Sequence, residues 1–539
     1  MRRLLILFGL LIAGAAVAKP LDVREIWQPL PHPSIPLRSP VLTGAEPPAD
    51  GPPEGAPNVI MITVDTWRAD RLSLYGSDRK TSPWLDALAE QAVVFDRASA
   101  PAPWTWPTMV SLAAGVPPRS HGAVKPDTPL CEEADTLAEV LYAGGWRTGF
   151  AGVNTYFEPP EAGYRQGFEF FWAGGLAVAE SVLEYSSYFL DGVGPEPFFL
   201  HAHFFDPHCP YDPEESVLAE VRAVPQGHRG RGEGKAIRME AMEVATCHYV
   251  PPVPSHVHEE EIKAYKPSLD LQDYLDYYDA ELLETDRAMA RLQERLEKDG
   301  LWDNSWVVIT GDHGEEFGEH GDVGHGNALH PEVVWVPLVI KPPRGAPFQP
   351  GHRSEPVSLV DVPATLAAAV GRPAPASWQG RDLGPTLRGE AMAPRPVVTE
   401  TFYRDKAWSA SVEWDGMRLV VSGTHPPRAQ LYLADDRLED EDAFADDDLH
   451  LRVRAAGLAG LLRQELQGMT ARRLCDVGTM ELDPTHWEAL RELGYVVGRG
   501  PEEEPPLQEQ EPPPEDPEPP LPPDQDLAPE EDPNKRVQD

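Results

Sequence analysis

The sequence is short of cysteine. Its 539 residues include four cysteines, Cys131, Cys209, Cys247 and Cys475, and no two of them form a Cys-x-x-Cys pair. This scarcity excludes a dense disulfide scaffold and argues against a structural zinc site. An even number of cysteines permits disulfides, but the sequence leaves their pairing open, with Cys209–Cys247 as one candidate.

Basic residues are also scarce. The chain has 46 Lys and Arg against 88 Asp and Glu, which gives a formal net charge of −42. Nucleic acids and anionic membrane surfaces are bound mainly through clusters of Lys and Arg. We therefore expect no nucleic-acid partner.

Apolar runs long enough to span a bilayer are missing too. The N-terminal run from Leu4 to Val17 follows Arg2-Arg3, ends in Ala16-Val17-Ala18 and falls short of the ~20 residues that a membrane span needs. A charged start, a short apolar run and a small-residue site are typical of a cleaved signal peptide. We expect a signal peptide at 1–18, a secreted or periplasmic protein, and no transmembrane span after cleavage.

Proline, in contrast, is abundant, with 60 residues. Prolines recur every few residues through 19–57, which predicts an extended Pro-rich linker. The segment 499–539 is mostly Pro, Glu, Asp and Gln, and it cannot bury enough apolar surface to offset the entropy of ordering it. It is predicted to be a disordered acidic tail.

Strand and helix patterns alternate between these two ends. The residues Asn58-Val59-Ile60-Met61-Ile62-Thr63-Val64 form a β-branched run typical of a strand that is covered on both faces. Four more strands and three helices follow in the same manner, the first of these helices being capped by Ser82-Pro83. This order predicts an α/β fold with a largely parallel sheet between helices. The other strands are expected at 147–151, 198–205, 306–310 and 336–340, and the other helices at 135–143 and 273–298.

Polar residues follow three of the predicted strands directly. These are Asp65-Thr66, Asp206-Pro207-His208 and Asp312-His313. The carboxyl ends of parallel strands meet at one edge of a sheet, where α/β proteins bind ligands. Carboxylates and imidazoles that converge there predict a divalent metal site.

Several motifs in this order resemble the sulfatase family. They cover about residues 57–498 and include Val64-Asp65-Thr66-Trp67-Arg68, Gly311-Asp312-His313-Gly314 and Gly324-His325-Gly326. The resemblance implies an alkaline-phosphatase-like fold, with a large mixed, mostly parallel sheet and a small C-terminal α+β subdomain. It also implies hydrolysis of sulfate or phosphate esters by a catalytic domain at 58–385, followed by the subdomain at 386–498. Further matching motifs are Thr81-Ser82-Pro83-Trp84, Pro103-Trp104-Thr105-Trp106-Pro107, His121-Gly122, Phe205-Asp206-Pro207-His208 and Gln430-Leu431-Tyr432-Leu433.

The resemblance also implies roles for individual residues. Asp65, Thr105, Asp312 and His313 match ligands of one divalent metal ion, which the sequence leaves open as Ca, Mn, Zn or Mg. Thr105, His208 and His325 match catalytic positions. Many relatives carry a second Asp after the first, where this chain has Thr66, so its site is less anionic than a typical calcium site.

One departure from the family concerns the nucleophile. Sulfatases carry a Cys/Ser-x-Pro-x-Arg motif whose first residue is oxidised to formylglycine, whereas this chain has Thr105-Trp106-Pro107-Thr108-Met109. A threonine cannot give that aldehyde because its β-carbon already bears a methyl group. No formylglycine is expected. The Lys and His of the sulfate pocket also lack clear counterparts, and Gly152-Val153-Asn154 stands in that stretch.

An unmodified Thr105 is still a competent nucleophile. We expect it to be the N-cap of a helix that contains Pro107, runs to Ala114 and stops at Gly115. The helix dipole and a bound metal would both favour the ionised hydroxyl. The alternative is that Thr105 is only a helix cap in an inactive relative.

The sequence therefore predicts an exported, metal-dependent hydrolase acting on a small-molecule, glycan or lipid ester. Phosphate esters or diesters suit a threonine nucleophile better than sulfate esters do. The alternatives are a phospho-group transferase that acts on an envelope sugar or lipid, and a non-catalytic binding protein. Trp104 and Trp106 could line the substrate pocket or pack in the core. Among the other histidines, the role of His320 stays open, and His201, His203 and His248 are expected to be solvated.

Overall fold

The computed structural model describes residues 51–480, with gaps at 175–177, 210, 225–270, 321–322, 404–407, 424–427, 435, 437–438, 440 and 446–447. Contacts group residues 1–497 into one unit and 498–539 into a second. The predicted signal peptide, nearly all of the predicted linker and the predicted tail lie outside the described residues, as does His248.

A central sheet of nine strands organises the first unit. Its order is β10-β2-β9-β6-β1-β5-β3-β4, and β11 also pairs with β2. Among the described strands of this sheet, only β9 runs antiparallel to its neighbours, so the predicted mixed, mostly parallel sheet is confirmed. The strands are β1 (Asn58–Val64), β2 (Val93–Ser99), β3 (Arg147–Val153), β4 (Phe170–Gly174), β5 (Phe198–Phe204), β6 (Ser305–Gly311), β9 (Trp335–Lys341), β10 (Gly351–Arg353) and β11 (Val357–Ser358).

The sequence of β1 explains its place in the middle of this sheet. All seven of its residues are buried. Val59 and Met61 belong to the hydrophobic core on one face, while Ile60 and Ile62 belong to the core on the other. Such a strand is stable only where helices cover both faces of the sheet.

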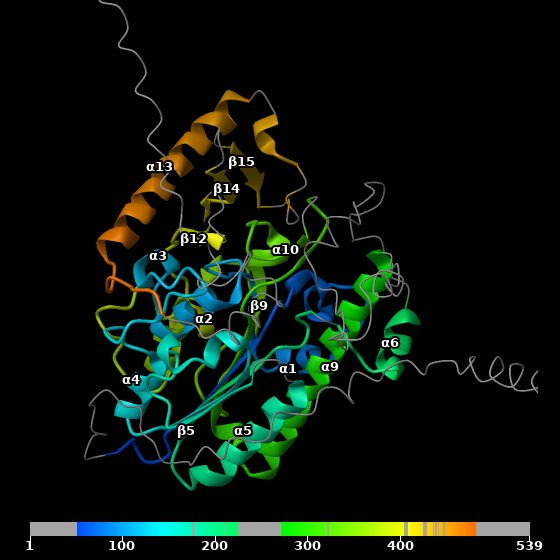
Figure 1. The fold of residues 1–539 in the computed structure, drawn as a ribbon, viewed down its shortest axis with the longest axis vertical. Coiled ribbons are helices and arrows are strands. Elements are labelled where there is room, and N and C mark those ends of the chain that lie inside the picture. Colours follow the sequence, from blue (N-terminus) through cyan, green and yellow to red (C-terminus); the bar gives the residue numbers. More distant parts are fainter. Residues whose placement is uncertain are drawn as a thin grey trace, which may run out of the picture. The chain divides into compact units, whose positions relative to one another are not determined.

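Helices cover the two faces as the sequence predicts (Figure 1). On one face, α2 (Thr105–Ala114), α4 (Leu137–Ala143) and α11 (Asp361–Ala369) supply core residues. On the other, α1 (Pro83–Ala89), α5 (Ala179–Val193) and α9 (Leu271–Lys298) do so. The shorter elements are α3 (Pro118–His121), α6 (Glu215–Arg222), α10 (Pro331–Val334), α12 (Gly384–Leu387), β7 (Glu316–Phe317) and β8 (Val323–Gly324).

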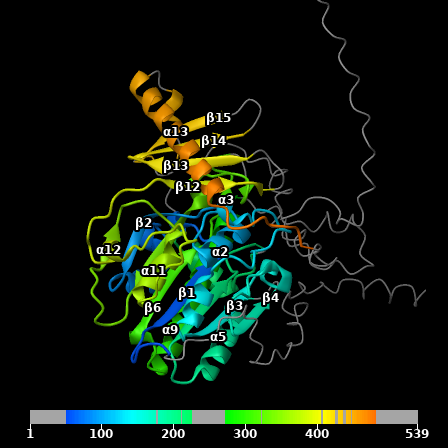
Figure 2. The same cartoon turned by 90° about the vertical axis from the view of Figure 1, so that its left-hand side faces the viewer.

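A second, antiparallel sheet forms the C-terminal part of the described chain. It consists of β12 (Val397–Thr401), β13 (Ser409–Trp414), β14 (Met417–Ser422) and β15 (Arg428–Leu433), in that order. Helix α13 (Leu449–Ala471) packs on this sheet, and the two share a separate hydrophobic core. Figure 2 shows this subdomain beside α3, above the central sheet. The predicted small α+β subdomain is confirmed.

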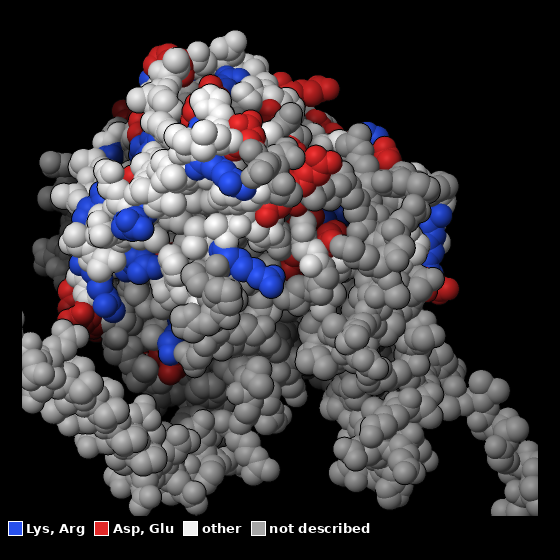
Figure 3. Space-filling model, turned by 90° about the horizontal axis from the view of Figure 1, so that it is seen from above, with Lys and Arg blue, Asp and Glu red and all other residues white. Residues whose placement is uncertain are grey.

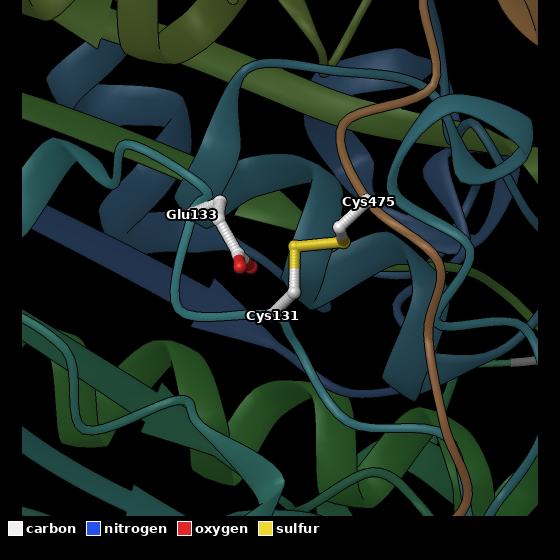
Figure 4. A group of neighbouring side chains, drawn as sticks. All are labelled: Cys131, Glu133 and Cys475. Atoms are coloured by element: carbon white, nitrogen blue, oxygen red, sulfur yellow. A yellow bond between two sulfur atoms is a disulfide. The ribbon is translucent and has the colours of Figure 1, made fainter.

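A disulfide ties the end of the subdomain back to the central domain. It joins Cys131 to Cys475, which are 344 residues apart in the sequence. Figure 4 shows Glu133 next to this bond, but each sulfur is already bonded to the other, so the three residues are not offered as a metal site. The sequence did not reveal this pairing. The candidate partner of Cys209, Cys247, lies outside the described residues.

The described surface carries both signs of charge. On the face seen in Figure 3, basic and acidic side chains are interspersed, and the described part of it has no extended basic patch. None of the described helices is long and apolar enough to cross a membrane.

Candidate active site

Four neighbouring parallel strands, β6, β1, β5 and β3, end at the same edge of the central sheet. The backbone continues the ladder one residue past two of them: the N–H of Asp65 donates to Phe204 O at 2.9 Å, and the N–H of Asp312 donates to Val64 O at 3.1 Å. This pairing fixes Asp65 and Asp312 next to each other, as their positions after β1 and β6 predicted.

Asp65 is the centre of a fully buried polar cluster. Its Oδ1 lies 3.3 Å from His313 Nε2, and its Oδ2 lies 3.4 Å from Thr105 Oγ1. Thr105 Oγ1 and His313 Nε2 are 3.1 Å apart, and Asp312 Oδ2 is 3.7 Å from the same His313 nitrogen. The structure thus brings together the four residues predicted to be metal ligands.

The predicted N-cap role of Thr105 is wrong. The N-cap is Trp104, whose backbone is extended at φ −162° and ψ 161°, and Thr105 is the first helical residue of α2. The Thr105 hydroxyl is directed at Asp65 and His313. As predicted, α2 ends at Ala114, and Gly115 adopts the left-handed conformation with φ 61°. Glycine suits this position because a side chain would strain the backbone there.

The cluster contains two residues that sequence reasoning missed. Asn154 follows β3, and its Nδ2 donates to Asp65 Oδ2 at 2.9 Å. His203 lies in β5, with its Nε2 at 3.7 Å from the same oxygen. The expectation that His201 and His203 are solvated is wrong, because both are buried in β5. Asn154 could have been found as one more polar residue directly after a strand.

The donor atoms of this cluster fit a divalent cation. Asp65, His203 and Asp312 each offer one ligand atom, and these atoms lie within 4.8 Å of one another. Asp312 Oδ2 and His203 Nε2 are buried and have no hydrogen-bond partner among the described residues. Buried polar atoms are rarely left unpaired, and a bound cation would satisfy both.

Electrostatics point the same way. Burial and the neighbouring Asp65 raise the pKa of Asp312 well above its usual range. Burial would also raise the pKa of Asp65, but His208, His203 and His313 outweigh it and hold that pKa well below its usual range. Two adjacent buried carboxylates repel each other when both are ionised, and a cation between them relieves that repulsion.

The two predicted catalytic histidines lie side by side near the cluster. The ring of His208 is 5.2 Å from that of His325, and the ring of His325 is 4.5 Å from that of His313. His208 Nδ1 bonds Cys209 O at 2.6 Å, and His325 Nδ1 contacts Glu315 Oε1 at 3.2 Å. Burial lowers the pKa of His208, partly offset by Asp65, whereas burial raises the pKa of Glu315 to about 7.

Other residues that the sequence left open lie outside the cluster. His320 Nε2 pairs with Glu332 at 3.3 Å, and its ring stacks on that of His330 with centroids 3.7 Å apart. Trp104 and Trp106 are buried and belong to the hydrophobic core, so the packing interpretation holds for both.

Comparison with known proteins shows which family the chain resembles. A family model described as Sulfatase matches residues 57–372, which is more than half of the chain. The ulvan-active sulfatase of Formosa agariphila is 25% identical over 355 residues, a match that covers 62% of this chain and 65% of the relative. The chain thus spans slightly less than two thirds of that protein. The N-acetylglucosamine-6-O-sulfatase of Bacteroides thetaiotaomicron is 23% identical over 413 residues, which cover 64% of this chain and 74% of the relative.

Solved structures show the same fold. The phosphonate monoester hydrolase of Agrobacterium radiobacter superposes with a TM-score of 0.61 at 21% identity, covering 76% of this chain and 96% of that one. A protein solved with its substrate D-glucosamine-2-N,6-O-disulfate superposes with a TM-score of 0.64 at 20% identity, covering 77% of this chain and 98% of that one.

Proposed function

The chain belongs to the sulfatase family, and we propose that this sulfatase-like ester hydrolase uses Thr105 as its nucleophile together with one divalent metal ion. The observation that carries the proposal is the position of the Thr105 hydroxyl. It lies 3.1 Å from His313 Nε2 and 3.4 Å from Asp65 Oδ2, at the point where the carboxylates and imidazoles converge.

The residues that would hold the metal are Asp65, Thr105, Asp312 and His313. Donor atoms of Asp65, Thr105 and His313 lie 3.1 to 3.4 Å from one another, and Asp312 Oδ2 lies 3.7 Å from His313 Nε2. Ligand atoms about 2.0–2.2 Å from one ion and 90–110° apart around it lie roughly 3.0–3.5 Å from each other. A bound divalent ion would lower the pKa of the Thr105 hydroxyl and polarise the ester that it attacks.

The side chains then divide the reaction between them. Thr105 gives up its hydroxyl proton to solvent, and its Oγ1 forms a bond to the central phosphorus or sulfur while the bond to the leaving oxygen breaks. His208 donates a proton through Nε2 to that oxygen, because its Nδ1 is engaged by Cys209 O. Water then attacks the threonine ester and returns a proton to His208, and Thr105 leaves with a proton regained from solvent. The sum of the steps is hydrolysis of one ester bond.

Charge favours an ester with a single negative charge. The described side chains that bond or pair with Asp65 are Thr105, Asn154, His203 and His313, and they include no Lys or Arg. A dianionic phosphate monoester would meet the Asp65 and Asp312 carboxylates with one cation to offset them, whereas a diester or a sulfate ester carries one charge less. An unmodified threonine ester of phosphate is released by water more readily than a sulfated threonine is. We therefore propose a phosphodiester substrate first and a sulfate ester second.

Export and the domain limits belong to the same proposal. The Cys131–Cys475 disulfide supports export, because disulfides persist mainly in oxidising compartments. The catalytic part is proposed to span 58–385 and the C-terminal subdomain 386–498. The acceptor of the group is proposed to be water, and a sugar or lipid hydroxyl in its place would make the protein a transferase.

A set of three variants tests the proposal on chromogenic phosphodiester, phosphate monoester and sulfate ester substrates. Thr105→Ala should abolish turnover with little change in stability, because Trp104 and not Thr105 is the N-cap of α2. Thr105→Ser should keep part of it. The matched control is Thr108→Ala in the same helix, whose hydroxyl donates to Ala102 O and lies outside the cluster. Wild-type turnover in Thr105→Ala would rule out the nucleophile.

A further inference from the structure

We propose that His203 is an additional ligand of the same metal ion, so that two imidazoles and two carboxylates surround it together with the Thr105 hydroxyl. This inference rests on the proposed function, because it concerns the ion that the proposal places at Asp65, Thr105, Asp312 and His313. It assigns a role to a strand residue that neither the sequence pattern nor the comparisons single out.

The first support is a buried nitrogen without a bond. His203 is fully buried, and its Nε2 has no hydrogen-bond partner among the described residues. The nearest carboxylate oxygen, Asp65 Oδ2, is 3.7 Å away, beyond the range of an N–H···O bond. A histidine buried for packing normally has both ring nitrogens paired. A cation between the two atoms would satisfy this nitrogen.

The second support is spacing. The 3.7 Å between His203 Nε2 and Asp65 Oδ2 equals the distance between His313 Nε2 and Asp312 Oδ2. It is close to the roughly 3.0–3.5 Å expected for neighbouring ligands of one ion. Asp65, His203 and Asp312 also present atoms within 4.8 Å of one another, so His203 faces the carboxylate pair itself.

The third support is the partner of the other ring nitrogen. His203 Nδ1 is 2.8 Å from Thr63 Oγ1, and that hydroxyl is 3.0 Å from His201 Nε2. If Nδ1–H donates to Thr63 and Thr63 donates to His201, the lone pair of His203 is on Nε2. Metal-binding histidines typically have a second-nitrogen bond of this kind, which fixes the ring and its tautomer.

Asn154 completes the arrangement without competing for the ion. Its Nδ2 donates to Asp65 Oδ2 at 2.9 Å, and its Oδ1 accepts from the backbone N–H of Tyr156. A carboxylate oxygen has a second lone pair, so Asp65 can accept this bond and still bind a cation.

A second imidazole ligand changes which metal the site should prefer. Imidazole ligands suit Zn²⁺ and other transition metals, whereas all-oxygen sets suit Ca²⁺ and Mg²⁺. With two imidazoles, the site should prefer Zn²⁺ or Mn²⁺ to Ca²⁺. The four metals that the sequence left open are thereby reduced to two.

The first test needs no variant. X-ray absorption on the intact protein loaded with one equivalent of Zn²⁺ should show two imidazoles per zinc. One imidazole per zinc would overturn the role of His203 and leave the proposed function standing. Failure of the wild-type protein to bind Zn²⁺ or Mn²⁺ would overturn the role of His203, and failure to bind Ca²⁺ and Mg²⁺ as well would overturn the proposed function.

The second test compares the zinc affinity of four proteins by competition with a fluorescent chelator. His203→Asn should bind Zn²⁺ more than about 100-fold more weakly than the wild type, since loss of an outer partner alone costs about 10–100-fold. Thr63→Val should fall within that smaller range. The control His121→Asn removes a buried histidine outside the cluster and should keep the wild-type affinity. An unchanged affinity in a folded His203→Asn protein would contradict the inference, and if that variant does not fold, the absorption measurement decides.

Discussion

At the scale of single residues, burial keeps three histidines neutral at pH 7, whereas Asp312 and Asp65 outweigh burial at His313 and raise its pKa to about 9. His208, His201 and His121 are all buried, and burial lowers the pKa of each. An imidazole with a lowered pKa is neutral at pH 7 and becomes protonated only in acid. This limits when His208 can act as a general acid, and it makes the stability of the fold depend on pH.

The role of His208 predicts a dependence on the leaving group. His208→Ala should slow diesters with poor alkyl leaving groups by about 10²–10⁴-fold, because their leaving oxygen needs a proton. It should barely affect p-nitrophenyl esters. In the wild type, the rate with alkyl diesters should fall as pH rises through a pKa below 6.5, the usual value, because the protonated form is lost.

Steady-state kinetics on both substrate classes check this prediction. Equal losses on alkyl and p-nitrophenyl esters would point to a role in binding, and no loss on either would dismiss His208.

His121 predicts a pH dependence of stability. Its Nδ1 accepts the N–H of Ala123 at 3.0 Å and its Nε2 lies 3.2 Å from Pro107 O, so protonation would bring two N–H groups together at Nδ1. Burial lowers its pKa to about 3, although the bond to Pro107 O opposes this. The folded pKa lies below the unfolded value of about 6.5, so this contribution is present above pH 6.5 and is lost as pH falls toward 3.

Urea unfolding at a series of pH values checks this. Between pH 6.5 and 4.5 the wild type should lose about 2–3 kcal/mol more unfolding free energy than His121→Gln does, since each pH unit is worth up to ~1.4 kcal/mol. Parallel slopes for the wild type and His121→Gln would refute the prediction.

At the scale of elements, the segment between β6 and α10 is held by one buried arginine. Arg68 pairs with Asp70 at 2.8 Å and with Glu319 at 2.7 Å, and it donates to Glu315 O at 2.9 Å. It is 3% exposed, so the pairs are shielded from water. This segment carries Glu315 and His325. Arg68, which lies shortly after β1, bonds the backbone of Glu315, and the Glu315 carboxylate contacts His325.

Removal of this arginine should therefore be costly. Arg68→Met should lower the unfolding free energy by up to about 3–5 kcal/mol, because it leaves the partly buried carboxylates of Asp70 and Glu319 without this partner. Arg68→Lys should recover part of that loss, because lysine keeps the positive charge. The recovery should be incomplete, because lysine cannot form the same forked bonds.

Chemical denaturation measures both variants. The control Arg291→Met breaks the exposed pair Arg291–Glu180 and should cost less than about 1 kcal/mol. A cost for Arg68→Met as small as that of the control would contradict the structural role.

The sequence predicted elements better than it predicted their pairing. Strand β1 and helix α9 are readable from a continuous β-branched run and a long amphipathic pattern. The antiparallel direction of β9 and the edge strand β10 depend on contacts between distant segments, which periodicity does not encode. The same limit explains why the sequence did not single out His203. Nothing in the pattern of β5 distinguishes this residue from the others in the strand, and its place beside Asp65 follows from the pairing of His203 with Thr63 in β1.

At the scale of the whole molecule, the C-terminal subdomain contacts the part of the central domain that carries His325. The N–H of Gly326, next to His325, donates to Pro103 O at 2.8 Å, and Gly326 O accepts from Thr401 Oγ1 at 2.7 Å. Thr401 belongs to β12, so the C-terminal subdomain contacts the segment that carries His325. The motif resemblance indicated both parts of the fold, but the Cys131–Cys475 link could not be read from four scattered cysteines.

The proposed function depends above all on a covalent bond between Thr105 and the substrate. Mass spectrometry of the acid-quenched protein during turnover of a chromogenic phosphodiester tests it most directly. Wild-type protein should carry an added phosphoryl ester group on the peptide that contains Thr105, and Thr105→Ala should lack it. Turnover with the phosphoryl ester group on another residue, or a burst of product with Thr105 unmodified, would contradict covalent catalysis by Thr105.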